Sequence, residues 1–319
     1  MARATVHAAG GKLPAGKFIA AEHADTPTAR KVRAFYEKIT YHPNPPSQPL
    51  ADRIAALERD WNNWVVPVGL RGKRTLDVGC GCGYNLALHA GLASVAVGLD
   101  VSLPSLERAV DYCSSEGVLE HAFFVHGDIS CLDLPAGSFD LITCVGVLHH
   151  IPGHQAALKN MVRLLDRGGY LLLGVYHPSG RFWHRVKRKL VWLFSGRSER
   201  RMTRLARFVF QTRKEAEKYN IPEDIYVKDS YTAPVEKAFS VAYIQRLLGA
   251  CGLTLLQVRP SPAIPFRKPV DLLASLRIDG QSGAHLLPDA AIADAELGRM
   301  RRHHYWCLLR KGLPRPETV

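Results

Sequence analysis

The sequence lacks the features that mark several large classes of proteins. No uninterrupted apolar stretch approaches the length of about 20 residues that a membrane-spanning helix needs. The amino-terminal segment has no basic stretch followed by a long apolar core, so no secretory signal is expected. Acidic residues are scarce, with 29 Asp and Glu against 42 Lys and Arg over 319 residues. We therefore expect a cytoplasmic protein, with peripheral membrane contact as an alternative that the basic charge leaves open.

The sequence also lacks any arrangement of cysteines that is typical of a metal site. The seven cysteines are spread along the chain, and Cys80 and Cys82 have no second pair at zinc-site spacing. Most cysteines lie in expected strands, helices or turns, as is typical of reduced thiols. No metal site is predicted.

A glycine-rich turn is the first positive feature. Gly79, Gly81 and Gly83 follow the apolar run 75–78 and precede a helical pattern over 86–90. Glycine has no Cβ and tolerates positive φ, so the chain can turn sharply and a ligand can approach the backbone. The spacing differs from the dinucleotide fingerprint, and the Gly-Lys-Ser/Thr ending of a phosphate loop is missing. The turn alone indicates only a nucleotide-binding corner of a doubly wound α/β fold.

Acidic side chains follow the next expected strands. The run 94–99 ends in Asp100, and the run 123–127 is followed by Asp128. A carboxylate can accept hydrogen bonds from both vicinal hydroxyls of a ribose. Two more strands are expected at 139–145 and 170–176, with a helix over 158–165 between them. The pattern favours a nucleoside ligand at the carboxyl ends of these strands.

This ordered series, from Thr75 to His177, resembles the class I S-adenosylmethionine-dependent methyltransferases. The resemblance implies the cofactor S-adenosyl-L-methionine, with its methionine part at the glycine corner, its ribose at Asp100 and its adenine near Asp128. The alternative is a Rossmann-like domain for another nucleoside. The implied cofactor-binding residues are Asp77, Gly79, Cys80, Gly81, Gly83, Asp100, Val101, Asp128, Ile129, Cys144 and Val145.

Further motifs resemble a bacterial subgroup of this family that acts on small molecules. They are the segments 146–150, 176–181 and 229–231. Ala233 stands where that subgroup usually has histidine, so any role of that histidine is absent or supplied elsewhere. The subgroup implies no particular acceptor.

The expected fold class is α/β: a Rossmann-like class I methyltransferase with a seven-stranded, mainly parallel sheet, an N-terminal helical cap and helical insertions. We expect a mobile tail over 1–25 and a single methyltransferase domain over 26–319. The expected parts of the domain are a helical cap (26–70), a cofactor-binding core (71–180), a basic helical insertion (181–228), and the C-terminal part of the sheet (229–319) with an insertion over 260–302.

Candidate acceptor-site residues lie after the fourth and fifth strands and in the cap. His149, His150 and His177 are candidate general bases, because a neutral imidazole is available near physiological pH. The alternative is that they orient backbone or pack on the cap. The candidate substrate-binding residues, for which aromatic packing and ordinary ion pairing are the alternatives, are Tyr36, Tyr41, Tyr176, Arg181, Asp229 and Tyr231.

The segment 181–218 carries most of the positive charge. It has 13 Lys and Arg against three acids, a net charge of +10 out of the formal +13. Its first helix has apolar residues on one side. One interpretation is a lid whose apolar face covers the pocket. The other is attraction to an acidic partner: an anionic membrane or acidic substrate before a nucleic acid, since no RNA-binding module is recognisable.

The sequence thus predicts methyl transfer to a small-molecule or lipid-like acceptor by in-line displacement, with the acceptor positioned by the cap, His149, His150 and the basic insertion. An RNA-modifying enzyme and a non-catalytic cofactor-binding scaffold are the alternatives. The acceptor atom and the oligomeric state are left open.

Overall fold

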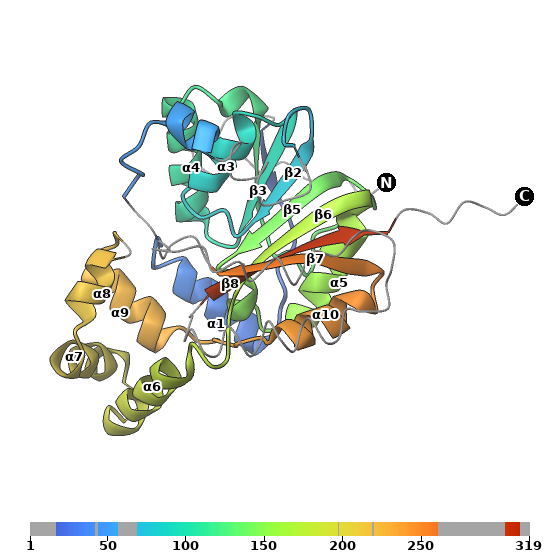
Figure 1. Cartoon of the computed structure of the whole chain (residues 1–319). Helices are drawn as coiled ribbons and strands as arrows, with labels where there is room; N and C mark the ends of the chain where they lie inside the picture. Colours follow the sequence, from blue (N-terminus) through green and yellow to red (C-terminus); the bar gives the residue numbers. More distant parts are fainter. Residues whose placement is uncertain are drawn as a thin grey trace, which may run out of the picture.

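A single mixed sheet organises the described part of the chain. The computed structural model describes residues 17–41, 44–56, 69–196, 198–218, 220–260 and 304–312. Within these residues eight strands pair in the order β1-β4-β3-β2-β5-β6-β8-β7 (Figure 1). The strands are β1 (Phe18–Ala20), β2 (Arg74–Val78), β3 (Val95–Asp100), β4 (Ala122–His126), β5 (Phe139–Val145), β6 (Leu165–Tyr176), β7 (Leu253–Pro260) and β8 (His304–Lys311).

Helices cover both faces of this sheet, and a group of helices forms a lobe to one side of it (Figure 1). The helices that flank the sheet are α1 (Pro27–Tyr36), α3 (Tyr84–Ala90), α4 (Leu103–Ser115), α5 (His154–Leu164) and α10 (Val241–Gly249), with the short turns η1 (Leu119–His121) and η2 (Leu148–His150). The lobe, called the helical lobe below, contains α6 (Phe182–Phe194), α7 (Glu199–Val209), α8 (Thr212–Lys218), α9 (Glu223–Val227) and the π-helical turn η3 (Lys228–Thr232).

Strand order places a crevice at the centre of the sheet. The strands β2, β3, β4, β5 and β6 run parallel, and β8 pairs antiparallel with both β6 and β7. The chain moves outward from β2 through β3 to β4 and then returns to the other side of β2 as β5. Such a reversal leaves an open crevice at the carboxyl ends of the central strands, where α/β proteins bind ligands.

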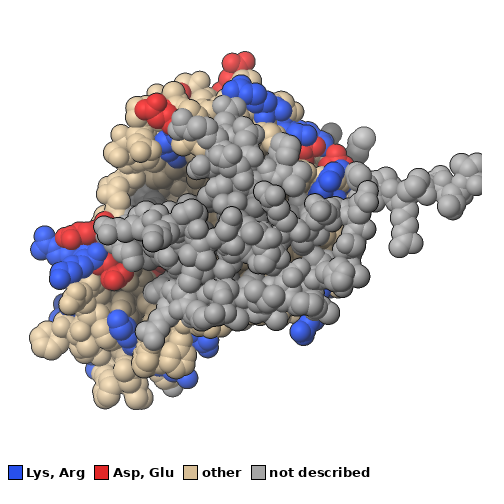
Figure 2. Space-filling view, viewed as in Figure 1, with Lys and Arg blue, Asp and Glu red and all other residues tan. Residues whose placement is uncertain are grey.

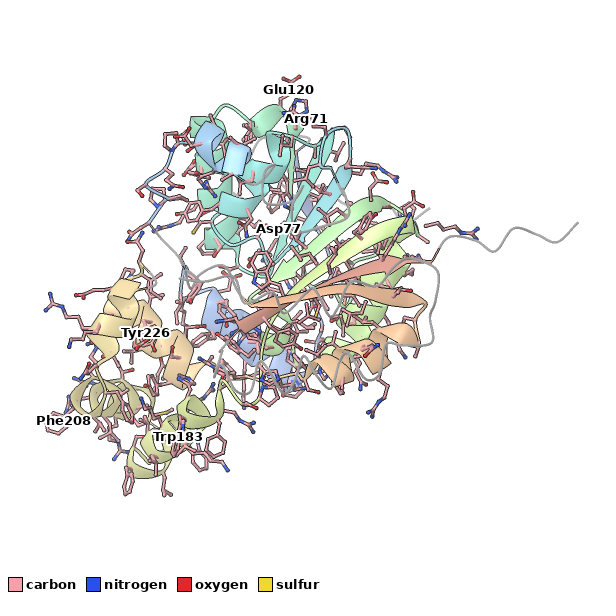
Figure 3. The ribbon with its side chains drawn as sticks, viewed as in Figure 1. Arg71, Asp77, Glu120, Trp183, Phe208 and Tyr226 are labelled. Carbon is pink, nitrogen blue, oxygen red and sulfur yellow. The ribbon has the colours of Figure 1, made fainter. Side chains whose placement is uncertain are left out.

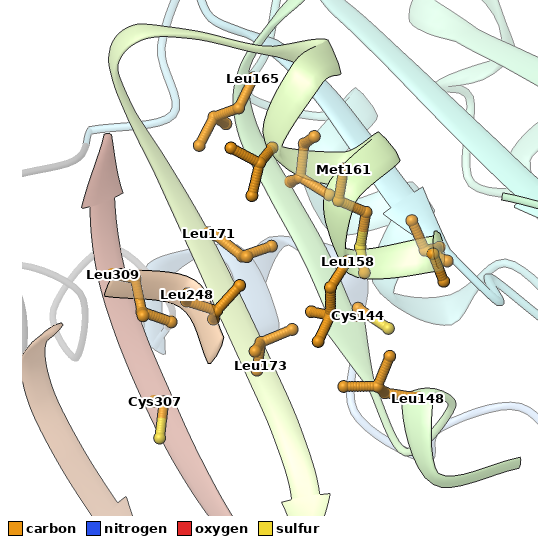
Figure 4. Close-up of a cluster of buried hydrophobic side chains, with 14 of the residues drawn as sticks. Cys144, Leu148, Leu158, Met161, Leu165, Leu171, Leu173, Leu248, Cys307 and Leu309 are labelled. Atoms are coloured by element: carbon orange, nitrogen blue, oxygen red, sulfur yellow. The ribbon is translucent and has the colours of Figure 1, made fainter. Parts of the chain in front are cut away.

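The core fills the space between the sheet and its helices. On one face, side chains of α5 and α10 pack on β5, β6 and β8, with Leu158, Met161 and Leu248 among the buried residues (Figure 4). On the other face, Leu86 of α3 and Leu106 of α4 are fully buried. Since both faces are covered, most residues of the central strands are buried and apolar, as is usual for parallel sheets, although Thr75 and Asp77 of β2 are buried polar residues.

The eighth strand corrects two expectations from the sequence. The sheet has eight strands in place of seven, because β1 pairs in parallel with β4 and Phe18 lies opposite Phe124. The expectation of an unstructured tail over 1–25 is therefore wrong for Phe18–Ala20. A three-residue apolar run is too short to show a period, and its pairing depends on the distant edge of β4. Two parts of the expected domain, residues 57–68 of the helical cap and residues 261–302 of the C-terminal insertion, lie outside the described residues.

The orientation of α6 does not fit the lid, which is one of the two interpretations of the segment 181–218. His184 and Val191 are its buried residues, whereas Leu193 is 65% exposed and Phe194 is 74% exposed. The apolar side of this helix therefore points away from the protein. The helical lobe still reaches the crevice, but through other residues, described below.

Candidate active site

A cavity of about 580 Å³ lies at the carboxyl ends of the central strands. Its wall combines the turn after β2, the ends of β3, β4 and β5, the cap helix α1 and parts of the helical lobe. The cofactor-binding residues predicted from the sequence that line it are Gly79, Cys80, Gly81, Asp100, Val101, Asp128, Ile129 and Val145. Asp77, Gly83 and Cys144 are not among the residues that line it.

The glycine corner is closely packed on its inner side and open toward the cavity. Gly79 has a φ of +70°, and a Cβ there would lie 2.3 Å from Cγ2 of Val147. Its amide donates to the carbonyl oxygen of Leu99 at 2.7 Å, which ties the turn to β3. Gly81, by contrast, faces open space. Only glycine satisfies both the positive φ and the contact at position 79.

Asp100 is held at the cavity wall by two backbone amides. Its Oδ2 accepts from the amide of Gly81 at 2.8 Å, and its Oδ1 accepts from the amide of Ser102 at 2.9 Å. Burial raises the pKa of Asp100, while these two hydrogen bonds oppose the rise. Each carboxylate oxygen has a second lone pair, so the group can still accept from two hydroxyls of a ligand.

Asp77 is a residue of β2, one of the central strands of the sheet (Figure 3). Its Oδ1 accepts a hydrogen bond from Oγ1 of Thr143 at 2.7 Å. Burial raises the pKa of Asp77 to about 7, and the nearby charge of Asp100 acts in the same direction. A carboxyl group that is close to half protonated near neutral pH is suited to respond to a cationic ligand group.

The edge of the cavity near Asp128 contains a residue that the sequence did not predict. His23 lines the wall, and its ring lies 4.7 Å from that of His126. Burial, followed by the charge of His126, lowers the pKa of His23 to about 4. Asp128 accepts from the amide of Ser130 at 2.8 Å. The sequence offered no indication of His23, because its position depends on the pairing of β1.

His150 presents one ring nitrogen to a backbone carbonyl. Its Nδ1 lies 2.8 Å from the carbonyl oxygen of Val235, and His150 lines the cavity. A carbonyl oxygen can only accept, so Nδ1 carries the proton. In the neutral ring, Nε2 is therefore the basic nitrogen.

Side chains of the cap and of η3 meet beside His150. The hydroxyl of Tyr36 donates to Oδ1 of Asp229 at 3.2 Å, and the Tyr36 ring lies 5.9 Å from that of His150. Burial and the charge of Asp229 raise the pKa of the Tyr36 hydroxyl well above its usual value. Tyr36 is thus held as a neutral donor. Tyr41, Tyr176, Arg181 and Asp229 complete the predicted substrate residues that line the cavity.

Arg181 belongs to a buried ion-pair group. Its Nη2 lies 2.8 Å from Oε2 of Glu236, its guanidinium lies 4.0 Å from the ring centre of Tyr176, and Nη1 of Arg188 lies 3.1 Å from the same Glu236 oxygen. Burial disfavours the Glu236 charge, but Arg181 outweighs it, so the pKa of Glu236 is lowered. The group anchors the start of α6 to the segment after η3.

We expect Glu236→Gln to lower the free energy of unfolding by about 3–5 kcal/mol at neutral pH, because Arg181 loses its partner while still buried. The deficit should shrink as the pH falls through the pKa of Glu236, because protonation removes the same charge from the unsubstituted protein. Denaturant unfolding at several pH values measures it. Glu217→Gln, in an exposed pair with Arg213, is the control and should change stability by less than about 1 kcal/mol. Equal effects of the two substitutions would contradict the buried-pair interpretation.

Three residues predicted for the acceptor site lie away from the cavity wall. The His149 ring stacks on Tyr176 at 3.7 Å between ring centres, and neither of its nitrogens has a hydrogen-bond partner in the described part of the chain. Burial lowers the pKa of His149 well below its usual value. His177 is buried, and Tyr231 stacks on Phe210 at 5.8 Å. The acceptor roles predicted for these three residues therefore stay predictions.

Several wall residues were not predicted. Glu215 and Tyr226 come from the helical lobe, Arg33 from the cap, and His304 and Trp306 from β8. Nothing in their local sequence distinguishes them from ordinary surface or strand residues. Among the described residues, no group of three or more His, Cys, Asp or Glu side chains is arranged to hold a metal ion, and no helix is long and apolar enough to cross a bilayer.

Comparison with known proteins agrees with this geometry. Residues 76–173 match the family model described as "Methyltransferase domain". An uncharacterized protein of Synechococcus sp. is 28% identical over 198 residues, covering 57% of this chain and 48% of its own. The ubiquinone biosynthesis O-methyltransferase of Ralstonia nicotianae is 29% identical over 141 residues, covering 44% of this chain and 58% of its own.

A solved structure extends the likeness beyond the matched domain. PKMT2 from Rickettsia typhi, in complex with AdoHcy, superposes with a TM-score of 0.54 at 17% identity, over 91% of this chain and 53% of that one. At this identity the likeness concerns the fold. The chain spans about half the length of the curated relatives it matches. Residues 76–173 therefore contain a methyltransferase domain, and the order of the strands and the glycine corner agree with the fold of that domain.

Proposed function

We propose that this protein transfers a methyl group from S-adenosyl-L-methionine to a small-molecule or lipid-like acceptor. The observation that carries the proposal is the shared cavity. Asp100 and the glycine corner line one part of it, and His150, Tyr36 and Asp229 line another. A donor site and an acceptor site that open into one cavity are what a direct transfer requires.

The residues of the first part fit the cofactor. Asp100 retains lone pairs for two hydroxyls of the ribose, and Gly81 leaves space beside the backbone. Asp77, in the strand before the glycine corner, is a carboxyl group that can pair with the ammonium group of the cofactor. When bound, S-adenosylmethionine supplies an electrophilic methyl group on a sulfonium sulfur. The protein's contribution is to hold the acceptor in line with that group and to exclude water, which can be worth roughly 7–11 kcal/mol.

The residues of the second part are suited to a polar acceptor group. Nε2 of His150 can accept its proton, since the bond from Nδ1 to Val235 fixes the tautomer. Tyr36 and Asp229 can bind a neighbouring polar group of the acceptor. Tyr176 and Trp306 add aromatic side chains to the wall. We propose His150 as the general base; a thiol or tertiary amine acceptor would not need it.

We expect His150→Ala to lower kcat by about 10²–10⁴-fold for an acceptor that must lose a proton. Binding of S-adenosylmethionine should change little, because His150 is on the acceptor side. Steady-state kinetics and calorimetric titration separate the two effects. His121→Ala, at an exposed position in η1, should leave both unchanged. Once the acceptor is identified, an unchanged kcat in the His150 variant would rule out His150 as the general base.

Isotope transfer tests the function itself. The protein is incubated with methyl-labelled S-adenosylmethionine and, separately, with small-molecule, lipid and RNA fractions of a bacterial extract. Label in the small-molecule or lipid fraction supports the proposal. Label in RNA would favour an RNA-modifying enzyme, the alternative suggested by the positive charge of the segment 181–218. Bound cofactor without any release of adenosylhomocysteine would indicate a non-catalytic scaffold.

A further inference from the structure

The outward face of α6 is apolar, which is unusual for a surface helix. At about 100° per residue, six apolar side chains occupy a sector of about 120° on this helix. They are Phe182, Trp183, Val186, Leu190, Leu193 and Phe194. The buried residues His184 and Val191 lie on the opposite side. An ordinary surface helix buries its apolar stripe against the core and exposes its polar side. Here the stripe is exposed, and no element among the described residues covers it.

The neighbouring helix α7 has a basic outward face. Met202 and Ala206 are its buried residues, and Phe208 is 89% exposed near its C-terminal end. The exposed basic side chains are Arg200, Arg201, Arg204 and Arg207. In Figure 3, Trp183 and Phe208 lie on the helical lobe, far from Asp77. Figure 2 shows Lys and Arg side chains on the same lobe, beside uncharged surface.

We propose that the outward faces of α6 and α7 bind the surface of an anionic lipid bilayer. These two faces, the docking face below, consist of the apolar stripe of α6 and the four arginines and Phe208 of α7. Aromatic and leucine side chains can enter the boundary between headgroups and acyl chains, while arginines and lysines remain at the level of the headgroups. The charge of the segment 181–218, +10 out of the chain's +13, is complementary to an anionic surface.

The composition of the docking face favours a bilayer over a nucleic acid. Nucleic-acid binding uses basic residues and aromatic stacking, but it leaves aliphatic side chains with little to contact. Leu190 and Leu193 belong to the apolar stripe of α6, and both are exposed. The basic residues Arg185, Lys187 and Lys189 flank this stripe at exposed positions. A lipid bilayer has charged headgroups and apolar acyl chains within a few ångströms of each other, so it can contact the basic, the aromatic and the aliphatic side chains of the docking face together.

The docking face is connected to the candidate active site by the lobe itself. Glu215 of α8 and Tyr226 of α9 line the cavity, and α7 packs against η3 and α9. Membrane docking goes beyond the proposed methyl transfer and does not depend on it. If both hold, the cavity lies beside the bilayer, where a lipid-like acceptor is concentrated.

Vesicle sedimentation tests the proposal. The purified chain is mixed with phosphatidylcholine vesicles, with and without phosphatidylglycerol. We expect binding to the anionic vesicles that weakens as salt is added, and weak or no binding to the neutral ones. The charge variant Arg200→Glu, Arg204→Glu, Arg207→Glu should bind anionic vesicles at least about 100-fold more weakly. The apolar variant Leu193→Ser, Phe194→Ser should bind about tenfold or more weakly.

A matched control separates the docking face from the overall charge. Arg71→Glu, Lys73→Glu, Lys159→Glu makes the same change in net charge at exposed positions outside the helical lobe. This control should bind vesicles nearly as well as the unsubstituted chain. Equal losses in control and charge variant would overturn the proposal, as would the absence of vesicle binding. Retention of RNA at low salt that the apolar variant leaves intact, or self-association that the apolar variant abolishes, would assign the face to those partners and overturn it too.

Discussion

Replacing Asp100 with alanine should weaken the binding of S-adenosylmethionine by roughly 10²–10⁴-fold. Hydrogen bonds to a charged group contribute about 1.5–3 kcal/mol each, and the proposed contact involves two ribose hydroxyls. The carboxylate is already fixed by the amides of Gly81 and Ser102 at 2.8 and 2.9 Å, so little ordering is needed when a ligand arrives. Calorimetric titration with S-adenosylmethionine and with adenosylhomocysteine measures the loss.

Two variants keep the Asp100 result interpretable. Alanine leaves both amides without an acceptor, which costs about 1–3 kcal/mol of stability for each. Asp100→Asn retains one acceptor oxygen, so it should lose less stability than the alanine variant and still bind the cofactor poorly. Asp111→Ala, at an exposed position in α4, is the control. A folded Asp100→Asn protein with unchanged cofactor affinity would refute the proposed ribose site.

The free protein should lose stability through Asp77 as the pH rises from about 4 to about 7. The pKa of this carboxyl is raised from its ordinary value to about 7 in the folded state, chiefly by burial. Between those values the unfolded chain has released the proton that the native state still holds, so stability falls with rising pH. At about 1.4 kcal/mol per pKa unit, the contribution reaches about 4 kcal/mol above pH 7.

Asp77→Asn should therefore stabilise the cofactor-free protein above pH 7, because the uncharged amide retains an acceptor for Thr143. The difference in unfolding free energy between the two proteins, measured from pH 4 to 8, isolates Asp77 from buried histidines such as His89. Burial lowers the pKa of His89 to about 4, and its contribution is lost as the pH falls. A difference that does not change with pH would contradict the raised pKa.

The same substitution should weaken cofactor binding. An ammonium group near Asp77 favours its charged form, so the binding of S-adenosylmethionine should release a proton when the pH lies below about 7. Calorimetry in two buffers with different ionisation enthalpies detects this proton. Asp77→Asn should abolish the release, whereas Asp111→Asn should not alter it. Proton release that persists in Asp77→Asn would place its source elsewhere.

Most of the core was predictable because its determinants are local. The strand ending in Asp77-Val78, the glycines at 79, 81 and 83, and the acid at position 100 lie within one strand–turn–helix–strand unit. Parallel strands in such a unit bring their carboxyl ends to one edge of a sheet, so the corner and Asp100 had to meet. The number of strands, by contrast, depends on contacts between residues that are far apart in the sequence. The run Phe18–Ala20 is regular only because β4 offers it a free edge.

The residues on the acceptor side of the cavity show most clearly what the sequence could not predict. His149 and His150 are neighbours in one short turn, and nothing in their sequence distinguishes a packed ring from a ring that lines the cavity. The stacking of His149 on Tyr176 and the bond from His150 to Val235 separate them, and both partners are distant in sequence. The orientation of α6 is a second case. Its apolar stripe was evident from the spacing, but the spacing left open whether the stripe covers the pocket or faces a partner.

The amino-acid sequence by itself determined the methyltransferase domain over 76–173, the strand–turn–helix corner and the positions of the carboxylates at the strand ends. The tertiary structure decided which side of α6 faces solvent, which histidine lines the cavity and that Glu236 joins Arg181 in a buried pair. Hydrophobic period and turn chemistry act between residues that are close along the chain. The side that a helix or ring presents depends on packing partners many residues away, and no local pattern specifies them.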